Sequence, residues 1–174
     1  MSKPATALLA LLAAGCAGYR TKFELPQHIR TFSVSTFTNK TLERNLDFEF
    51  TQALIREIEA KTPLRVAPPE EADLVISGEI DDFDRRSLRR RDRGLKSEMR
   101  LRLYVNVAMF DRKKVRMFFE GREITRRAEF AMNRGETFRQ AREEVVRELA
   151  RRVVSRAFEV WPQPEPQEAQ ARGG

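Results

Sequence analysis

The chain is poor in the residues that familiar catalytic and metal sites need. Its 174 residues include one cysteine, Cys16, and one histidine, His28. A single cysteine excludes an intramolecular disulfide and any cluster of thiolates. Without a second histidine or cysteine, Cys-His zinc sites and most Ser-His or Cys-His catalytic sets also lack their parts. The composition therefore predicts a protein that is not an enzyme and that holds no metal or other cofactor.

Long apolar runs are missing too, which excludes a membrane-spanning helix of about 20 residues. The run at 5–14 has ten residues, of which only Thr6 is polar, and it is followed by Gly15 and Cys16. A short apolar run after a basic residue is typical of a secretion signal. Residues 12–16 resemble a bacterial lipoprotein cleavage box, although Ala13 stands where leucine is commoner. The alternative is an ordinary apolar terminus with an incidental cysteine.

By that resemblance we expect cleavage before Cys16 and acyl chains, palmitate among them, on this cysteine. More than one acyl chain gives stable membrane attachment. Ala17 follows the cysteine, where an aspartate often retains lipoproteins in the inner membrane. The resemblance therefore implies the periplasmic face of the outer membrane.

Hydrophobic periodicity predicts six secondary-structure elements and the start of a returning strand. Apolar residues at three- and four-residue steps indicate helices at 42–60 and 136–158, and alternation indicates strands at 31–37, 64–67, 74–84, 99–109 and from 115 on, with a bulge beyond Gly121. We therefore predict an α+β two-layer sandwich, with two long helices on one face of a four- to five-stranded, mostly antiparallel mixed sheet. The helix between the first two strands allows a parallel crossover there.

The predicted organisation has four parts. Residues 1–15 are the lipoprotein signal peptide and 16–29 a lipidated tether. Residues 30–160 form the α+β domain, and 161–174 are a disordered tail rich in proline.

Positive charge is concentrated in one short window. The segment 85–96 contains seven basic residues against Asp92 alone, and it lies between two predicted strands, at the tip of a long hairpin. Packing like charges costs folding stability, which favours an anionic partner, and arginine binds phosphate through two parallel hydrogen bonds. We therefore predict a site for phosphate on a lipid or polymer, formed by Arg85, Arg86, Arg89, Arg90, Arg91, Arg93 and Lys96.

Other interpretations of the polar residues remain open. The window could be a solvated loop that only prevents aggregation. Nucleic acid is disfavoured, because the window has no aromatic residue for base stacking. Asp81, Asp82 and Asp84 could coordinate a hard cation, but their position beside Arg85 and Arg86 favours ion pairs.

Several segments together resemble the lipopolysaccharide-assembly lipoproteins, the LptE family. These are Gly18-Tyr19-Arg20 after the cysteine, Val34-x-x-Phe37-x-Asn39-x-Thr41 before an amphipathic helix, and the strand at 72–80, which reads ADLVISGEI. The resemblance implies non-enzymatic work: such a protein sits inside the LptD barrel, supports its folding and binds lipopolysaccharide. Activators of peptidoglycan synthases share the same features and remain the alternative.

The tether length separates these two lipoprotein functions. From Cys16 to Arg30 the chain spans at most about 50 Å, and an activator that crosses the periplasm needs a longer linker. The short tether therefore favours a domain held against the membrane, where a barrel or lipid headgroups lie.

Overall fold

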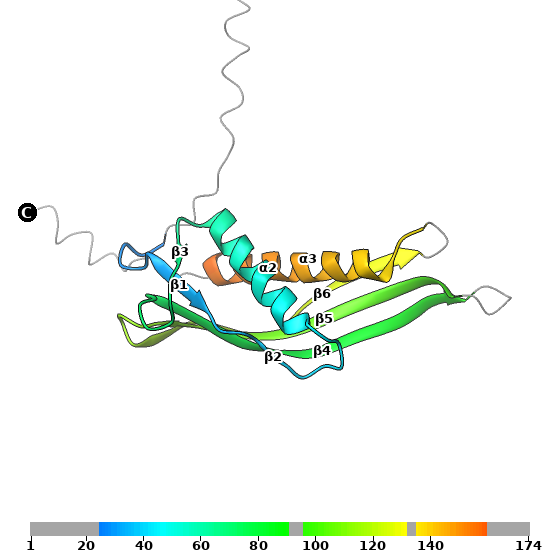
Figure 1. Ribbon diagram of the computed structural model, residues 1–174, viewed down its shortest axis with the longest axis horizontal. Helices are drawn as coiled ribbons and strands as arrows, with labels where there is room; N and C mark the ends of the chain where they lie inside the picture. Colours follow the sequence, from blue (N-terminus) through cyan, green and yellow to red (C-terminus); the bar gives the residue numbers. More distant parts are fainter. Residues whose placement is uncertain (1–24, 91–95, 132–134, 160–174) are drawn as a thin grey trace, which may run out of the picture.

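The computed structural model describes residues 25–90, 96–131 and 135–159. In chain order they form β1 (Thr31–Val34), β2 (Thr38–Asn39), α2 (Leu46–Lys61), β3 (Arg65–Val66), β4 (Leu74–Arg90), β5 (Lys96–Asp111), β6 (Arg116–Ala131) and α3 (Phe138–Glu159) (Figure 1). The expected signal peptide, Cys16, most of the tether and the proline-rich tail lie outside the described residues.

One mixed sheet forms the floor of the molecule. Its order is β3-β1-β4-β5-β6, with β2 also paired to β4. Strands β4, β5 and β6 are antiparallel and extend along the whole molecule, whereas β1 is parallel to β3 and β4, and β2 is parallel to β4. The predicted α+β class and the parallel crossover are confirmed. The prediction of a mostly antiparallel mixed sheet is confirmed in part: the three long strands pair antiparallel, and all three short strands pair parallel.

The strand count was also predicted too low, because the described part of the chain forms a six-stranded sheet. The additional strand, β2, lies between the predicted strand at 31–37 and the predicted helix at 42–60, where the sequence indicates a loop. Its two residues bond to β4 because the chain passes beside that strand before entering α2. Such a short strand carries no detectable alternation of its own.

Both helices begin later than predicted, because the residues before them form a turn and a cap. Helix α2 begins at Leu46, four residues later than predicted, because Asn45 adopts a left-handed backbone with φ 60° and the residues before it form a turn. Helix α3 begins at Phe138, where Thr137 and Gln140 form a reciprocal capping box. Thr137 accepts a hydrogen bond from the Gln140 N–H, and Gln140 accepts one from the Thr137 N–H.

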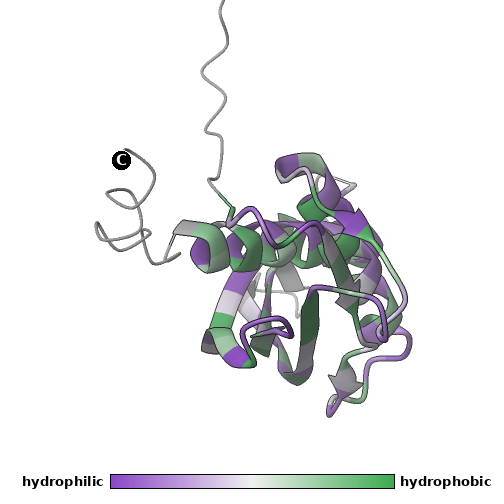
Figure 2. Ribbon diagram, turned by 90° about the vertical axis from the view of Figure 1, so that its left-hand side faces the viewer, coloured by the Kyte–Doolittle hydropathy of each residue, from purple (hydrophilic) through white to green (hydrophobic). Residues whose placement is uncertain are grey.

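Both helices lie on the same face of the sheet (Figure 2). Their apolar stripes and the alternate residues of β4, β5 and β6 enclose one hydrophobic core. Fully buried members include Phe50, Leu54, Leu103, Val105 and Leu149. The opposite face of the long strands is covered by no other described element, and it carries mostly polar and charged residues.

Two register shifts interrupt the long strands near their middle. One falls in β4 between Ile80 and Asp82, and the other in the β5–β6 pairing between Val105 and Val107. The second shift leaves Glu123 with a positive φ of 48°, and it confirms the bulge predicted beyond Gly121. The Asn106 side-chain oxygen accepts the Glu123 N–H at 2.8 Å, so it holds the bulged backbone in place.

Candidate functional site

The basic window lies at the far end of the β4–β5 hairpin, where the sequence placed it. Strand β4 continues six residues beyond the predicted end and carries Arg85, Arg86, Arg89 and Arg90 within the ladder. Strand β5 begins at Lys96. These residues are therefore held on strands rather than on a loop. Arg91 and Arg93 lie outside the described residues, as do the side chains of Arg89, Arg90 and Lys96.

The two described arginines of the window have different surroundings. The Arg85 guanidinium carbon lies 5.4 Å from the centroid of the Phe138 ring, at the start of α3. This cation–π contact orients Arg85 but leaves its charge without an acidic partner among the described residues. Arg86 pairs with Asp84 at 2.7 Å, yet 72% of its side chain is exposed. The hairpin therefore presents one unpaired and one partly neutralised guanidinium.

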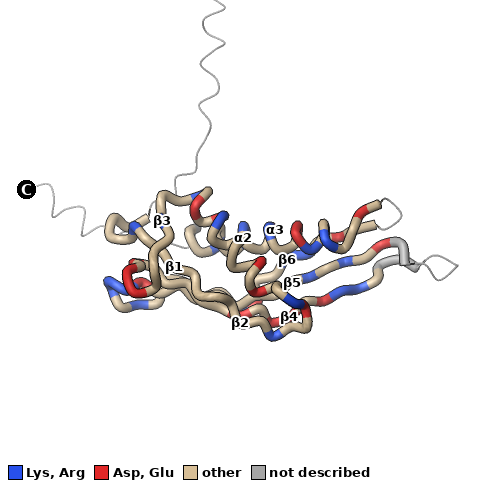
Figure 3. The backbone as a smooth tube through the Cα atoms, viewed as in Figure 1, with Lys and Arg blue, Asp and Glu red and all other residues tan. Residues whose placement is uncertain are grey.

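Sequence reasoning missed the cations that extend this surface across the uncovered face of the sheet. Arg86 stands opposite Arg100, which forms an ion pair with Glu129 at 2.7 Å. Two residues further along β5, Arg102 stands opposite Arg127 of β6. The signal was present in the alternation of β5, where buried residues alternate with half-buried ones. Figure 3 shows Lys and Arg positions recurring along the long strands.

Two of the residues that carry the family resemblance, Asp73 and Asn39, have structural tasks. The Asp73 carboxylate accepts the N–H groups of Arg30 and Thr31, at 2.8 Å and 3.1 Å, and pairs with Lys113 at 2.9 Å. The Asn39 side-chain oxygen accepts the Thr41 N–H at 3.0 Å, and its amide group donates to the Glu43 carbonyl at 2.8 Å. These residues therefore build the turn before α2 and attach β1 to β4.

A second polar cluster joins three strands on the uncovered face. Lys40 contacts Glu79 at 2.7 Å and Asp81 at 3.1 Å, and the Asn106 amide donates to both carboxylates. Hydrogen bonds from Lys40 lower the pKa of both carboxylates, and bonds to them raise the pKa of Lys40. Asp84 is bound to Arg86. Asp84 thus forms the kind of ion pair that the sequence favoured, whereas Asp81 pairs with Lys40 and not with either described arginine of the window. The described residues contain no group of three or more ligands placed for a metal.

The proline-flanked position of His28 indicates a surface residue, but in the structure only 24% of its side chain is exposed and its ring has a buried partner. Its Nε2 lies 2.8 Å from the Asp111 Oδ2, and the Asp111 side chain is fully buried. Burial raises the pKa of Asp111, but the bond to His28 and the Lys114 N–H outweigh it, so that the net shift is downward. The pair ties the segment before β1 to the end of β5.

Acid should destabilise the fold through Asp73. Burial alone would raise its pKa, but the bonds from Lys113 and from the Arg30 and Thr31 N–H groups lower that pKa to about 2. A lowered folded-state pKa adds stability above the unfolded pKa, and this contribution is lost as the pH falls from about 5 to 2. We expect Asp73→Asn to reduce the free energy of unfolding at pH 7 by about 1–2 kcal/mol and to flatten its acid dependence, measured by urea unfolding.

The matched control for that experiment is Glu71→Gln, an exposed carboxylate two residues away. It should leave both the stability at pH 7 and the acid slope nearly unchanged. If Asp73→Asn left the pH dependence of the free energy of unfolding unaltered, Asp73 would not be responsible for the loss of stability in acid.

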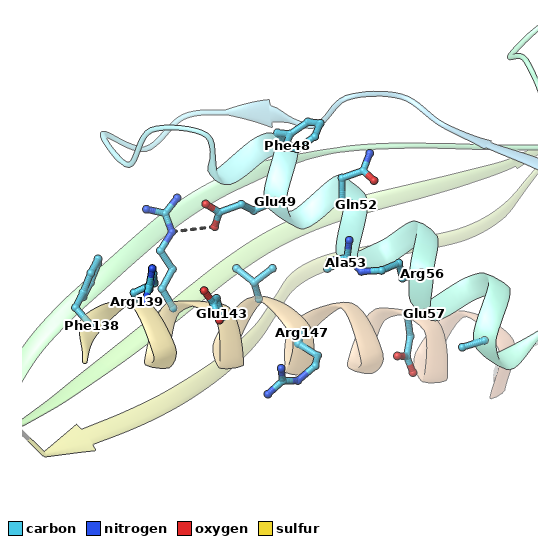
Figure 4. A pocket seen from close by; sticks show the side chains of 13 residues that line it. Phe48, Glu49, Gln52, Ala53, Arg56, Glu57, Phe138, Arg139, Glu143 and Arg147 are labelled. Atoms are coloured by element: carbon cyan, nitrogen blue, oxygen red, sulfur yellow. Dashed lines mark hydrogen bonds and ion pairs between the residues drawn. The ribbon is translucent and has the colours of Figure 1, made fainter. Parts of the chain in front are cut away.

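A groove of about 930 Å³ runs between α2 and α3 on the side away from the sheet (Figure 4). Ala53 and Val146 line it, and Phe48, 62% exposed, stands at one end. Arg142 closes one wall by binding Glu49 at 3.0 Å and the Arg44 carbonyl at 2.6 Å. The exposed Phe48, on the otherwise polar side of the predicted helix, was the signal that could have indicated this groove.

The fold and the site define a class of protein. It is a single α+β domain whose long hairpin presents arginines at one end, and whose described part contains no helix long and apolar enough to cross a membrane. The model of the lipopolysaccharide-assembly family, LptE, matches residues 29–157. The chain belongs to this family.

Solved structures with the same fold include the hypothetical protein CT253 from Chlamydia trachomatis. It is 16% identical, with a TM-score of 0.54, and the match covers 75% of this chain and 96% of that one. A minor lipoprotein from Acinetobacter baumannii is 16% identical at a TM-score of 0.45, covering 81% and 100% of the two chains. Lipoprotein B from Nitrosomonas europaea is 18% identical at 0.47, covering 78% and 88%. No curated protein matches significantly.

Proposed function

We propose that this protein is an outer-membrane lipoprotein that serves as the plug and assembly subunit of a lipopolysaccharide translocon. Acyl chains on Cys16 would anchor it at the periplasmic face, and an LptD-like β-barrel would enclose it. The hairpin end formed by Arg85, Arg86, Arg89, Arg90, Arg91, Arg93 and Lys96 would bind lipopolysaccharide phosphates. The observation that carries the proposal is a long β4–β5 hairpin with its basic window at the end remote from the segment before β1.

The dimensions of the hairpin suit this role. Strand β4 has 17 residues, which corresponds to about 55 Å of extended chain. A bilayer with its headgroup regions is about 40–45 Å thick. The described chain enters at the end of the sheet opposite to the basic window (Figure 1). A domain anchored at the inner leaflet could therefore extend arginines through a barrel lumen to the other side.

The chemistry of the hairpin end suits a phosphorylated ligand. Arginine keeps its charge at any relevant pH and offers a planar fork of donors that matches two phosphate oxygens. Arg85 is oriented by Phe138, and Arg86 remains largely exposed beside Asp84. A ligand can therefore meet guanidinium groups without displacing buried contacts.

The binding role is tested by reversing the charges at the hairpin end. We expect the triple variant Arg89→Glu, Arg90→Glu and Arg91→Glu to weaken binding to phosphorylated lipid A at low salt by more than tenfold, because three favourable contacts become repulsive. Calorimetry with phosphorylated and dephosphorylated lipid A would measure this. The control carries the same charge change at Arg56, Lys61 and Arg65, which are exposed cations elsewhere on the domain.

Unchanged affinity of the triple variant would remove the hairpin end from the binding site. Crosslinking followed by pull-down from solubilised outer membrane tests the partner separately. We expect a large β-barrel to be recovered with the protein. Recovery of a peptidoglycan synthase in its place would favour the alternative function.

A further inference from the structure

The turn between β5 and β6 together with the first two residues of β6, residues 112–117, combines exposed cations with exposed apolar side chains. We call this segment the turn. Arg112, Lys114 and Arg116 are exposed, and they flank Val115, which is 76% exposed, and Met117, which is 53% exposed. Few large apolar side chains in the described part of the chain are this accessible. Single exposed apolar residues are ordinary, but two within three residues of a basic turn form a small amphipathic surface.

Val115 is also strained. Its φ of 50° lies in the left-handed region, which β-branched residues rarely adopt because the side chain crowds the backbone. Glycine or asparagine would fit this turn position better. The turn thus keeps an apolar side chain in solvent at a cost to folding, and such cost is typical of positions that serve a purpose other than stability.

The turn lies where the tether enters the domain. The Lys113 ammonium donates to the His28 carbonyl at 3.0 Å, and His28 itself bonds to Asp111 at the start of the turn. From Leu25, the first described residue, nine residues lead back to Cys16, and they span at most about 32 Å. An anchor at Cys16 would therefore hold this turn close to the bilayer, while the basic hairpin end points away.

Most of the charge on the turn is free to meet an external anion. Lys113 is paired with Asp73, whereas Lys114 and Arg116 form no ion pair with any residue the structure describes. Arg112 donates to the Pro69 carbonyl at 2.6 Å and not to a carboxylate. The neighbouring turn carries the exposed Glu70 and Glu71, whereas residues 112–117 contain four cations and no acidic residue.

We propose that residues 112–117 rest on the surface of a bilayer that contains anionic phospholipids. Lys114 and Arg116 would meet headgroup phosphates, and Val115 and Met117 would enter the interfacial layer, as apolar residues of membrane-surface segments do. Each cation near an anionic surface contributes about a fivefold increase in affinity. The surface goes beyond the proposed lipopolysaccharide site, because it lies at the opposite end of the long strands and takes a different lipid.

The test uses the mature chain, residues 16–174, with Cys16→Ala, so that neither acyl chains nor the apolar signal peptide mask the contact. We expect this protein to float with vesicles of phosphatidylethanolamine and phosphatidylglycerol and not with phosphatidylcholine vesicles. Adding Lys114→Glu and Arg116→Glu should lower the affinity at least 25-fold. Adding Val115→Gly should lower it several-fold, yet raise the melting temperature, because glycine relieves the strained φ.

Opposite effects of Val115→Gly on binding and on thermal stability would distinguish a membrane contact from a structural role. Lys61→Glu combined with Arg65→Glu, the same charge change outside the turn, should leave flotation unchanged. Equal flotation of the turn variants and the parent would overturn the proposal. This outcome would leave the lipid A and barrel experiments unaffected, because those experiments depend on the hairpin end and on the partner.

Discussion

Replacing Gly78 by alanine is expected to lower the free energy of unfolding by about 3 kcal/mol. A Cβ atom at this position would lie 2.2 Å from the Asn106 backbone oxygen and 2.5 Å from the Phe37 ring. The first contact is with the backbone of the central strand β5, which cannot shift without disturbing its pairing to β4. Chemical denaturation of the purified variant would measure the loss.

A matched control is Gly135→Ala, because nothing lies within 4 Å of a Cβ atom there. Gly135 has a φ of 76°, so alanine should cost only about 1 kcal/mol of backbone strain. Equal losses at the two positions would show that the space beside Gly78 is not the limiting factor. Gly78 belongs to the segment 72–80 that carries the family resemblance. The lack of space for a side chain beside Asn106 and Phe37 explains why this position needs glycine.

The largest loss of stability is expected from Phe50→Ala, at about 3–5 kcal/mol. Phe50 is fully buried on α2 and meets Phe37 edge to face, with ring centroids 4.9 Å apart. Truncation would leave a cavity between α2, β2 and β4 that the rigid sheet cannot fill. Urea unfolding monitored by circular dichroism would give the difference.

Phe48→Ala on the same helix provides the control. It removes the same side chain from a position that is 62% exposed, so we expect a change below about 0.5 kcal/mol. Similar losses at Phe48 and Phe50 would contradict the assignment of the buried face of α2. A stable Phe48→Ala variant would also allow the exposed end of the α2–α3 groove to be examined without loss of the fold.

The motif residues and the proposed binding residues occupy different parts of the molecule. Asn39, Asp73 and Gly78 all serve the fold itself. Asn39 forms the turn before α2, Asp73 attaches β1 to β4, and Gly78 lets β4 and β5 approach each other. The two arginines of the hairpin end whose side chains the structure describes, Arg85 and Arg86, make few internal contacts. Family resemblance therefore identifies the fold, whereas the chemistry of the ligand has to be inferred from the charge on the hairpin.

The amino-acid sequence by itself determined the class of the fold, the two helices, the long strands, the parallel crossover and the position of the basic window. These follow from local periodicity, because the apolar side chains of Leu101, Leu103 and Val105 face one way along a strand whatever lies beside it.

The tertiary structure alone decided which residues meet across the sheet. It added β2, carried β4 through the first arginines of the window, brought Arg102 opposite Arg127, and joined His28 to the buried Asp111. Such contacts link residues up to 83 positions apart, and they depend on strand register and on bulges. Register is set by the packing of the whole sheet, so no local pattern in the chain could indicate them.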